Sequence, residues 1–226
     1  MKLSLTILSL ILIWSAGLPV CAKSSSNVQV AKLYPVDEAA KDPSFFVFRA
    51  KLLKIVQQRD SASLYQLLSA DVKNSFGGNG GVAEFKQMWN PERANSKLWS
   101  ELLLVLSLGG RFDGQGVFMA PYTFSNFPDA FDAFEHAAII EANVRVRKSP
   151  GIKSEILQTL SFDIVKVADW APIKKPGDQF EWITVTLADG QRGYAAKDYI
   201  RSPIDYRAIF NKVDGRWVIT AFIAGD

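Results

Sequence analysis

Cysteine and histidine are almost absent from this chain of 226 residues, which contains one of each. The cysteine, Cys21, lies in an N-terminal segment that we expect to be removed. The mature chain would then have no disulfide, no thiolate nucleophile and no cysteine metal ligand. Burial of apolar side chains must therefore hold the fold together. A hydrophobic fraction of 48% is sufficient for this in a mature chain of about 200 residues, as one or two domains.

An excess of charge of one sign is also lacking. The chain has 26 basic and 23 acidic residues, which gives a formal net charge of +3. The basic residues form no dense patch, and the closest groups are Arg145, Arg147 and Lys148 and the pair Lys174–Lys175. Nucleic-acid binding is therefore not indicated. A weak attraction to an anionic polymer of the cell envelope is compatible with this balance.

The first 22 residues have the pattern of a secretory signal peptide, with Lys2 at its start, an apolar run over 3–14 and a cleavage position after Ala22. An uncleaved membrane anchor is one alternative, but the run is short for a membrane span and a polar stretch follows it. A lipoprotein acylated at Cys21 is another, although Val20 before the cysteine fits that pattern poorly. We predict a periplasmic or secreted protein that has no transmembrane segment after cleavage.

Helical signals dominate the residues that follow a predicted flexible lead over 23–41. Asp42 followed by Pro43 is a helix start, with the acid as N-cap and the proline at the first helical position. The Gly-rich run over 77–81 lacks the lysine and hydroxyl residue of a phosphate-binding loop and is interpreted as a turn. We predict helices over 42–58, from Ser61 through Leu68, over 82–89, over 96–108 (buried on most sides) and over 129–136, with 72–76 and 112–127 extended.

The C-terminal residues predict a β-hairpin, because 206–211 and 216–223 alternate around Asp214–Gly215. Trp217, Ile219 and Phe222 do not share one face of an ideal strand, so we expect this hairpin to be buried on both sides. It is predicted to pack onto the helices and to complete an α+β unit made of 42–139 plus 203–226. Helices followed by a closing hairpin with the sequence DGRW resemble the cone-shaped α+β fold of nuclear transport factor two.

The segment inserted between these parts, 140–202, is rich in short β-type runs separated by turn residues. Its motifs are NVRVR followed by Ser149–Pro150, alternating valines at Val165 and Val167, a Trp-led strand over 182–185 and a Gly-x-x-Gly-Tyr turn over 190–194. In this order they resemble the bacterial SH3-like domain over residues 142–200. The resemblance implies a small all-β barrel, and the alternating valines and isoleucines would fill its interior.

The same resemblance implies a binding role, because family members often bind cell-wall peptides or mediate protein contacts in the envelope. The loop over 169–181 is longer than the family pattern, and it exposes Trp170 beside two lysines. Aromatic side chains of this segment could form a groove for a peptide or a sugar, although packing inside the barrel is the alternative for Trp182 and Tyr194. The predicted ligand-binding residues are Trp170, Lys174, Trp182, Tyr194 and Tyr199.

No catalytic residue, metal ligand or cofactor is predicted. His136 with Asp129 and Asp132 could be drawn as a metal site, but this group is interpreted as a solvated turn. The spacing of the carboxylates of Glu84, Glu101, Asp113 and Glu135 favours no pair for glycoside cleavage. The alternative function is a small-molecule binder or hydrolase with its site in the N-terminal α+β unit, in a pocket lined by Phe112, Phe118, Tyr122 and Phe124.

Overall fold

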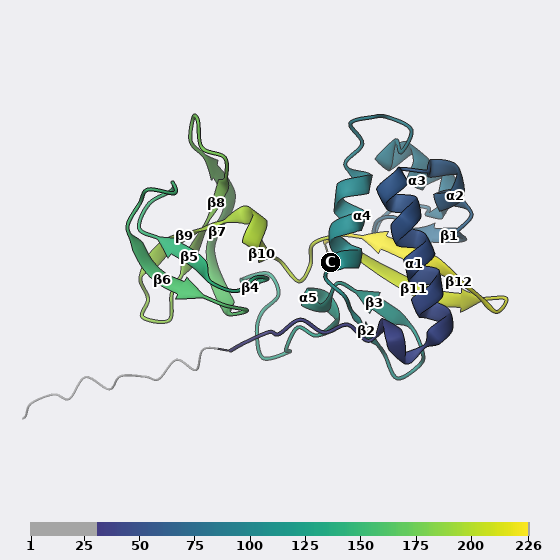
Figure 1. The fold of residues 1–226 in the computed structure, drawn as a ribbon, viewed down its shortest axis with the longest axis horizontal. Coiled ribbons are helices and arrows are strands. Elements are labelled where there is room, and N and C mark those ends of the chain that lie inside the picture. Colours follow the sequence, from purple (N-terminus) through teal and green to yellow (C-terminus); the bar gives the residue numbers. More distant parts are fainter. Residues whose placement is uncertain (1–30, 226) are drawn as a thin grey trace, which may run out of the picture.

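A computed structural model describes residues 31–225 of the protein. The predicted signal peptide, Cys21 and residues 23–30 of the expected lead lie outside the described residues. The described part contains two β-sheets and a group of helices that packs on one of them, so the predicted α+β class is confirmed (Figure 1).

The first sheet has five strands in the order β1-β12-β11-β3-β2. Strands β11 and β12 come from the C-terminus and lie between strands from the first half of the chain, so the two ends of the sequence build one sheet. Its strands are β1 (Leu68–Lys73), β2 (Arg111–Phe112), β3 (Phe118–Ala120), β11 (Arg207–Val213) and β12 (Arg216–Ile223). The accompanying helices are η1 (Ala39–Lys41), α1 (Pro43–Gln58), α2 (Ser61–Tyr65), α3 (Gly81–Trp89), α4 (Leu98–Ser107) and α5 (Tyr122–Ser125).

The helix starts follow the local signals of the sequence. The Asp42 carboxylate accepts hydrogen bonds from the backbone N–H groups of Ser44 at 2.8 Å and Phe45 at 3.0 Å, which satisfies donors that the first turn of α1 leaves open. Asp60 caps α2 in the same way. Helix α2 ends earlier than predicted, so Leu68 belongs to β1 and not to a helical face.

Two other predictions in this region need correction. Helix α4 buries one face, but Leu103 and Leu104 on its other side are each 36% exposed, so it is not buried on most sides. The aromatic segment over 112–127 is not simply extended. It contains β3 and the short helix α5, while β2 and β3 pair as an antiparallel hairpin.

The C-terminal hairpin forms as predicted, with Asp214 and Gly215 both at positive φ in its turn. A bulge alters its faces, because no residue of β11 pairs with Thr220, while Ile219 pairs with Phe210 and Ala221 with Ile209. One extra residue reverses the alternation of a strand. Trp217, Ile219 and Phe222 therefore point into the same helix-covered core, contrary to the expectation that they lie on different faces.

The core between helices and first sheet is built around aromatic rings. Phe45 is fully buried, and its ring centroid lies 4.2 Å from that of Phe118, 4.9 Å from that of Trp217 and 5.4 Å from that of Phe210. Phe112 packs on the same cluster, 5.0 Å from Phe118. These rings fill the space beneath α1. A small-molecule pocket lined by Phe112 and Phe118, as the alternative prediction has it, would need a cavity there.

The second sheet has seven strands in the order β10-β4-β7-β8-β9-β5-β6. It begins at His136, so the predicted helix over 129–136 is wrong: residues 129–135 are turns and β4 follows them. The end strands β10 and β6 do not pair, and the described strands therefore form an open sheet instead of the predicted closed barrel. The strands are β4 (His136–Ile139), β5 (Val144–Arg147), β6 (Ile156–Leu160), β7 (Ile164–Lys174), β8 (Glu181–Thr186), β9 (Arg192–Ala196) and β10 (Ile200–Arg201), with the short helix η2 (Lys197–Tyr199).

One face of the second sheet has its own hydrophobic core. The residues predicted to fill the interior all belong to this cluster, which confirms the alternation read from the sequence. Gly193 allows close packing here, since a Cβ atom at that position would lie 2.5 Å from a methyl group of Val146. The six residues concerned are Val144, Val146, Val165, Val167, Ile183 and Val185.

The expected flexible lead is packed over its described residues 31–41 and joins the two sheets. Leu33 is 3% exposed and lies in a small apolar cluster with Tyr122 and Ile164. Next to it, the Lys32 ammonium pairs with the buried Asp163 carboxylate at 2.8 Å. Backbone pairing and apolar burial together order this segment, and neither can be read from its local composition.

Candidate functional site

A groove of about 520 Å³ lies largely on the face of the second sheet opposite the valine core, although Val144 of that core also lines it. Strand alternation creates it, because Val146 and Ile183 point into that core while their neighbours Arg147 and Trp182 point the other way. The volume falls within the range of about 300–1,000 Å³ that is typical of ligand sites. The lining combines aromatic and charged side chains, chiefly Phe180, Trp182, Tyr199, Arg145, Arg147 and Glu141.

Three aromatic rings form one wall of the groove. The Phe180 ring centroid lies 6.0 Å from those of both Trp182 and Tyr199. Trp182 is 2% exposed, whereas Tyr199 is 36% exposed and offers its ring to a ligand. The Trp182 indole donates to the Asp178 carboxylate at 2.8 Å, and this bond lowers the pKa of Asp178 below its usual value. The wall is therefore held in place by a buried, hydrogen-bonded tryptophan.

The basic side of the groove comes from β5. Arg147 is 8% exposed, and its Nη1 donates to the carbonyl of Ser154 at 2.6 Å. Arg145, two residues earlier on the same face, is exposed. Glu141 adds a carboxylate to the lining. The groove thus combines an apolar wall with two guanidinium groups and one carboxylate.

The structure brings together two of the five predicted ligand-binding residues, Trp182 and Tyr199, at this groove. Tyr194 pairs with Thr184 and Arg147 and shares their face, but it is half-buried and does not line the groove. Among the lining residues that sequence reasoning missed are Phe180, Arg145 and Arg147, which a period of two could have indicated. Phe180 precedes Trp182 by two positions, and Arg145 and Arg147 alternate with Val144 and Val146.

Trp170 and Lys174 lie elsewhere, on the hairpin of β7 and β8. Trp170 is 39% exposed, and its indole donates to the carbonyl of Phe134 at 3.0 Å, which holds the ring against the turn before β4. The Lys174 ammonium donates to the carbonyl of Gln179 at 3.1 Å across the hairpin end. Neither side chain lines the groove.

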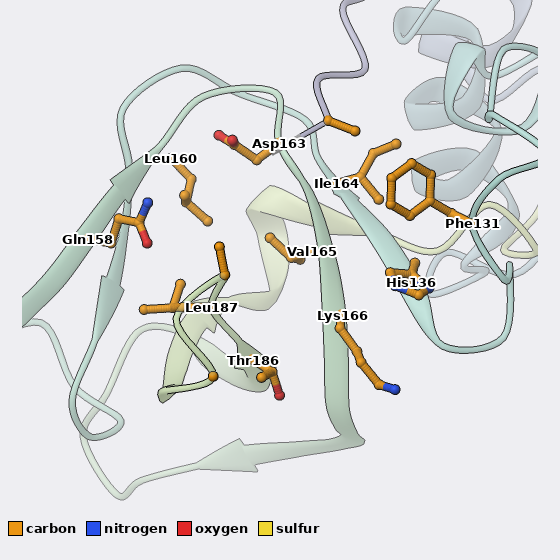
Figure 2. A pocket seen from close by; sticks show the side chains of 13 residues that line it. Phe131, His136, Gln158, Leu160, Asp163, Ile164, Val165, Lys166, Thr186 and Leu187 are labelled. Carbon is orange, nitrogen blue, oxygen red and sulfur yellow. The ribbon is translucent and has the colours of Figure 1, made fainter. Parts of the chain in front are cut away.

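A second cavity, of about 280 Å³, lies at the start of β7 (Figure 2). Leu160, Val165 and Leu187 turn toward its interior, while His136 and Lys166 lie at its margin. The two charged side chains at this cavity already have partners. Asp163 accepts from Lys32, and the Lys166 ammonium pairs with Glu135 at 2.8 Å. The cavity is therefore an apolar space without a converging acid–base pair.

The candidate catalytic groups do not converge. Glu101 pairs with Arg201 at 2.9 Å, and Asp113 accepts from the backbone N–H groups of its own turn. Among residues 31–225, no cluster of three His, Cys, Asp or Glu side chains has the geometry of a metal site. His136 packs against the ring of Phe131 at a centroid distance of 5.3 Å.

The alternative pocket of Phe112, Phe118, Tyr122 and Phe124 does not assemble either. Phe118 and Tyr122 are fully buried, the first in the core beneath α1 and the second in the cluster that joins the sheets. Phe124 lies under the guanidinium of Arg207, at 4.7 Å from the ring centroid. Phe112 and Phe118 therefore share the core beneath α1, whereas Tyr122 and Phe124 lie in other places.

No family model, curated protein or solved structure matched the chain in three comparisons. Within the part of the chain that the structure describes, no helix has the length and apolar character required to cross a membrane. The geometry of the groove therefore carries the functional argument by itself.

Proposed function

We propose that residues 142–200 form an SH3-like binding module, and that its aromatic groove binds an extended peptide segment in the bacterial cell envelope. The observation that carries the proposal is the wall of Phe180, Trp182 and Tyr199 beside the two arginines. Aromatic-lined grooves suit extended peptides, because rings offer large apolar contact at a low cost in side-chain entropy.

The proposed role is binding without catalysis, in the periplasm or outside the cell. The engagement of the candidate acids in ion pairs and turns supports the first part. The signal-peptide pattern of residues 1–22 supports the second. The motif order of 142–200, with its valine core, supports the SH3-like assignment. A wall peptide and an exposed segment of an envelope protein share the chemistry that this groove would recognise.

The test is co-sedimentation of the mature protein with purified cell-wall sacculi, prepared either stripped of protein or with attached protein. The double variant Phe180→Ala and Tyr199→Ala removes the half-buried and the exposed ring of the wall but keeps the buried Trp182. We expect its bound fraction to fall about tenfold, because central aromatic contacts carry most of the binding energy at such sites. Binding to stripped sacculi would identify wall peptide as the ligand, and binding only with attached protein would identify a protein segment.

A matched control replaces two exposed aromatic residues away from the groove, Tyr34→Ala and Phe46→Ala, which are 61% and 52% exposed in the native protein. This variant should sediment like the native protein. Thermal unfolding of both double variants shows whether either has lost its fold. The proposal is wrong if the native protein binds neither preparation, or if a folded groove variant binds as well as the control.

A further inference from the structure

We infer that the ligand of the groove carries a carboxylate, which Arg147 and Arg145 bind next to the aromatic wall. The inference rests on the proposed function and specifies the class of its ligand. It starts from a charged side chain that folding has buried without a charged partner.

Arg147 is more than nine-tenths buried and has no carboxylate within ion-pair distance in the described chain. A guanidinium has five N–H donors, and only the bond from Nη1 to Ser154 is made here. Among residues 31–225, several side-chain nitrogens and oxygens are fully buried without a hydrogen-bond partner, but no atom of Arg147 is one of them. The other nitrogens of Arg147 are therefore still accessible from outside. The groove that this side chain lines provides that access.

A buried cation without a counter-ion is costly, and an anion that enters the groove would offset this cost. Arg145 is placed to take part, because it lines the groove on the same face of β5 and forms no ion pair with any described residue. Glu141 contributes one negative charge to the lining. With two guanidinium groups and one carboxylate, these lining residues carry an excess of one positive charge, which a ligand with a single negative charge would neutralise.

A carboxylate matches these features better than a doubly charged anion. It brings one charge, and its planar pair of oxygens fits the fork of a guanidinium. The wall of Phe180 and Tyr199 would at the same time contact the apolar part of the ligand. The site is therefore suited to a peptide that presents a side-chain or terminal carboxylate beside an apolar group.

The first experiment uses two probes of the same shape, 3-phenylpropionate and the neutral 3-phenylpropionamide. Each is titrated into the mature protein and followed by NMR of backbone and arginine side-chain N–H groups. We expect the carboxylate to shift signals from β5 and the aromatic wall and to bind about tenfold more tightly than the amide, as charge-assisted hydrogen bonds predict. Equal affinity, no binding, or shifts confined to other parts of the protein would overturn the inference.

Variants then test the two arginines. Arg147→Gln should abolish the preference for the carboxylate probe, but it also weakens the hydrogen bond to Ser154. Arg145→Gln makes no such change and should reduce the preference several-fold. Arg192→Gln, an exposed arginine on β9 that does not line the groove, is the matched control and should retain it. A preference that survives both groove variants would contradict the assignment.

A comparison of two forms of the sacculi separates this inference from the proposed function. The free carboxylates of the sacculi are converted to amides, and binding of the native protein to the converted sacculi is compared with binding to the unconverted ones. Equal binding would overturn the carboxylate inference and leave peptide binding in place. Failure to bind either form, together with discrimination between the two probes, would reject the proposed function alone.

Discussion

Replacement of Phe45 by alanine should remove a large part of the stability of the α+β unit that contains the first sheet. Its ring is fully buried and lies within 6 Å of five other rings, at centroid distances from 4.2 Å to 5.9 Å. A buried Phe→Ala change typically costs about 3–5 kcal/mol, because apolar contacts are lost and a cavity remains. The rigid neighbouring rings limit collapse of that cavity, so we expect a loss above the lower end of this range, about 4 kcal/mol.

The neighbouring residue supplies the control. Phe46 has the same side chain on the same helix but is 52% exposed, so Phe46→Ala should change stability by no more than about 0.5 kcal/mol. Both variants are measured by urea unfolding, followed by circular dichroism for the helices and by tryptophan fluorescence, to which Trp217 contributes, with its ring 4.9 Å from that of Phe45. A loss below about 1.5 kcal/mol for Phe45→Ala, or equal losses for the two variants, would refute the account of this core.

Two further predictions concern ionisable groups of the described chain. Burial, together with the nearby charge of Glu141, raises the pKa of Tyr122 to about 12, whereas the unfolded chain ionises near 10. Its contribution to the free energy of unfolding should therefore be complete below pH 10 and decline as pH rises toward 12, by at most about 3 kcal/mol. Urea unfolding at pH 9 and pH 11 tests this: Tyr122→Phe should lose less stability between the two pH values than the native protein. The N-cap carboxylate of Asp42 has a pKa well below its usual range, mainly because the side chains of Ser44 and Lys212 donate hydrogen bonds to it. Asp42→Ala should lower the melting temperature by a few degrees at pH 7, and Asp42→Asn should lower it by less. The difference in melting temperature between each variant and the native protein should shrink as pH falls below about 4, because the native carboxylate then becomes protonated. A native melting curve for Asp42→Ala would contradict the capping role.

Local signals in the sequence were reliable where the physics is local. The N-caps at Asp42 and Asp60 and the turn at Asp214–Gly215 depend on side chains and backbone a few positions apart. They lie where the sequence predicts them. The alternating valines likewise identified one face of the second sheet, because a strand has a period of two whatever it pairs with.

Predictions that depended on distant partners were less successful. A single unpaired residue, Thr220, moved Phe222 to the same face as Trp217, and no local pattern marks that bulge. Residues 31–41 look like a polar lead, yet Leu33 is buried in a cluster with Tyr122 and Ile164, which lie far away in the sequence. The strand that begins at His136 exists because β7 and β10 offer it pairing partners.

The groove shows the same division. Trp182 and Tyr199 were predicted from the sequence as ligand-binding residues, but their joint wall with Phe180 arises from the turn before β8 and the short helix η2. Trp170 belonged to the same prediction and lies elsewhere, because its indole bonds to the turn before β4. Composition identifies side chains able to bind, and pairing of strands decides which of them meet.

The sequence by itself determined the α+β class, the absence of cysteine from the expected mature chain, the start of α1 at Asp42 and the alternation of the valines in the second sheet, since these depend on residue type and near neighbours. Only the tertiary structure decided the bulge that changes the faces of β12, the strand that replaces the helix predicted over 129–136, and the joining of two separate sheets through the segment after residue 31. It also decided that a nearly buried Arg147 lines the same groove as three aromatic rings. Such placements depend on which distant segments pair, and pairing is fixed by the burial of the whole core.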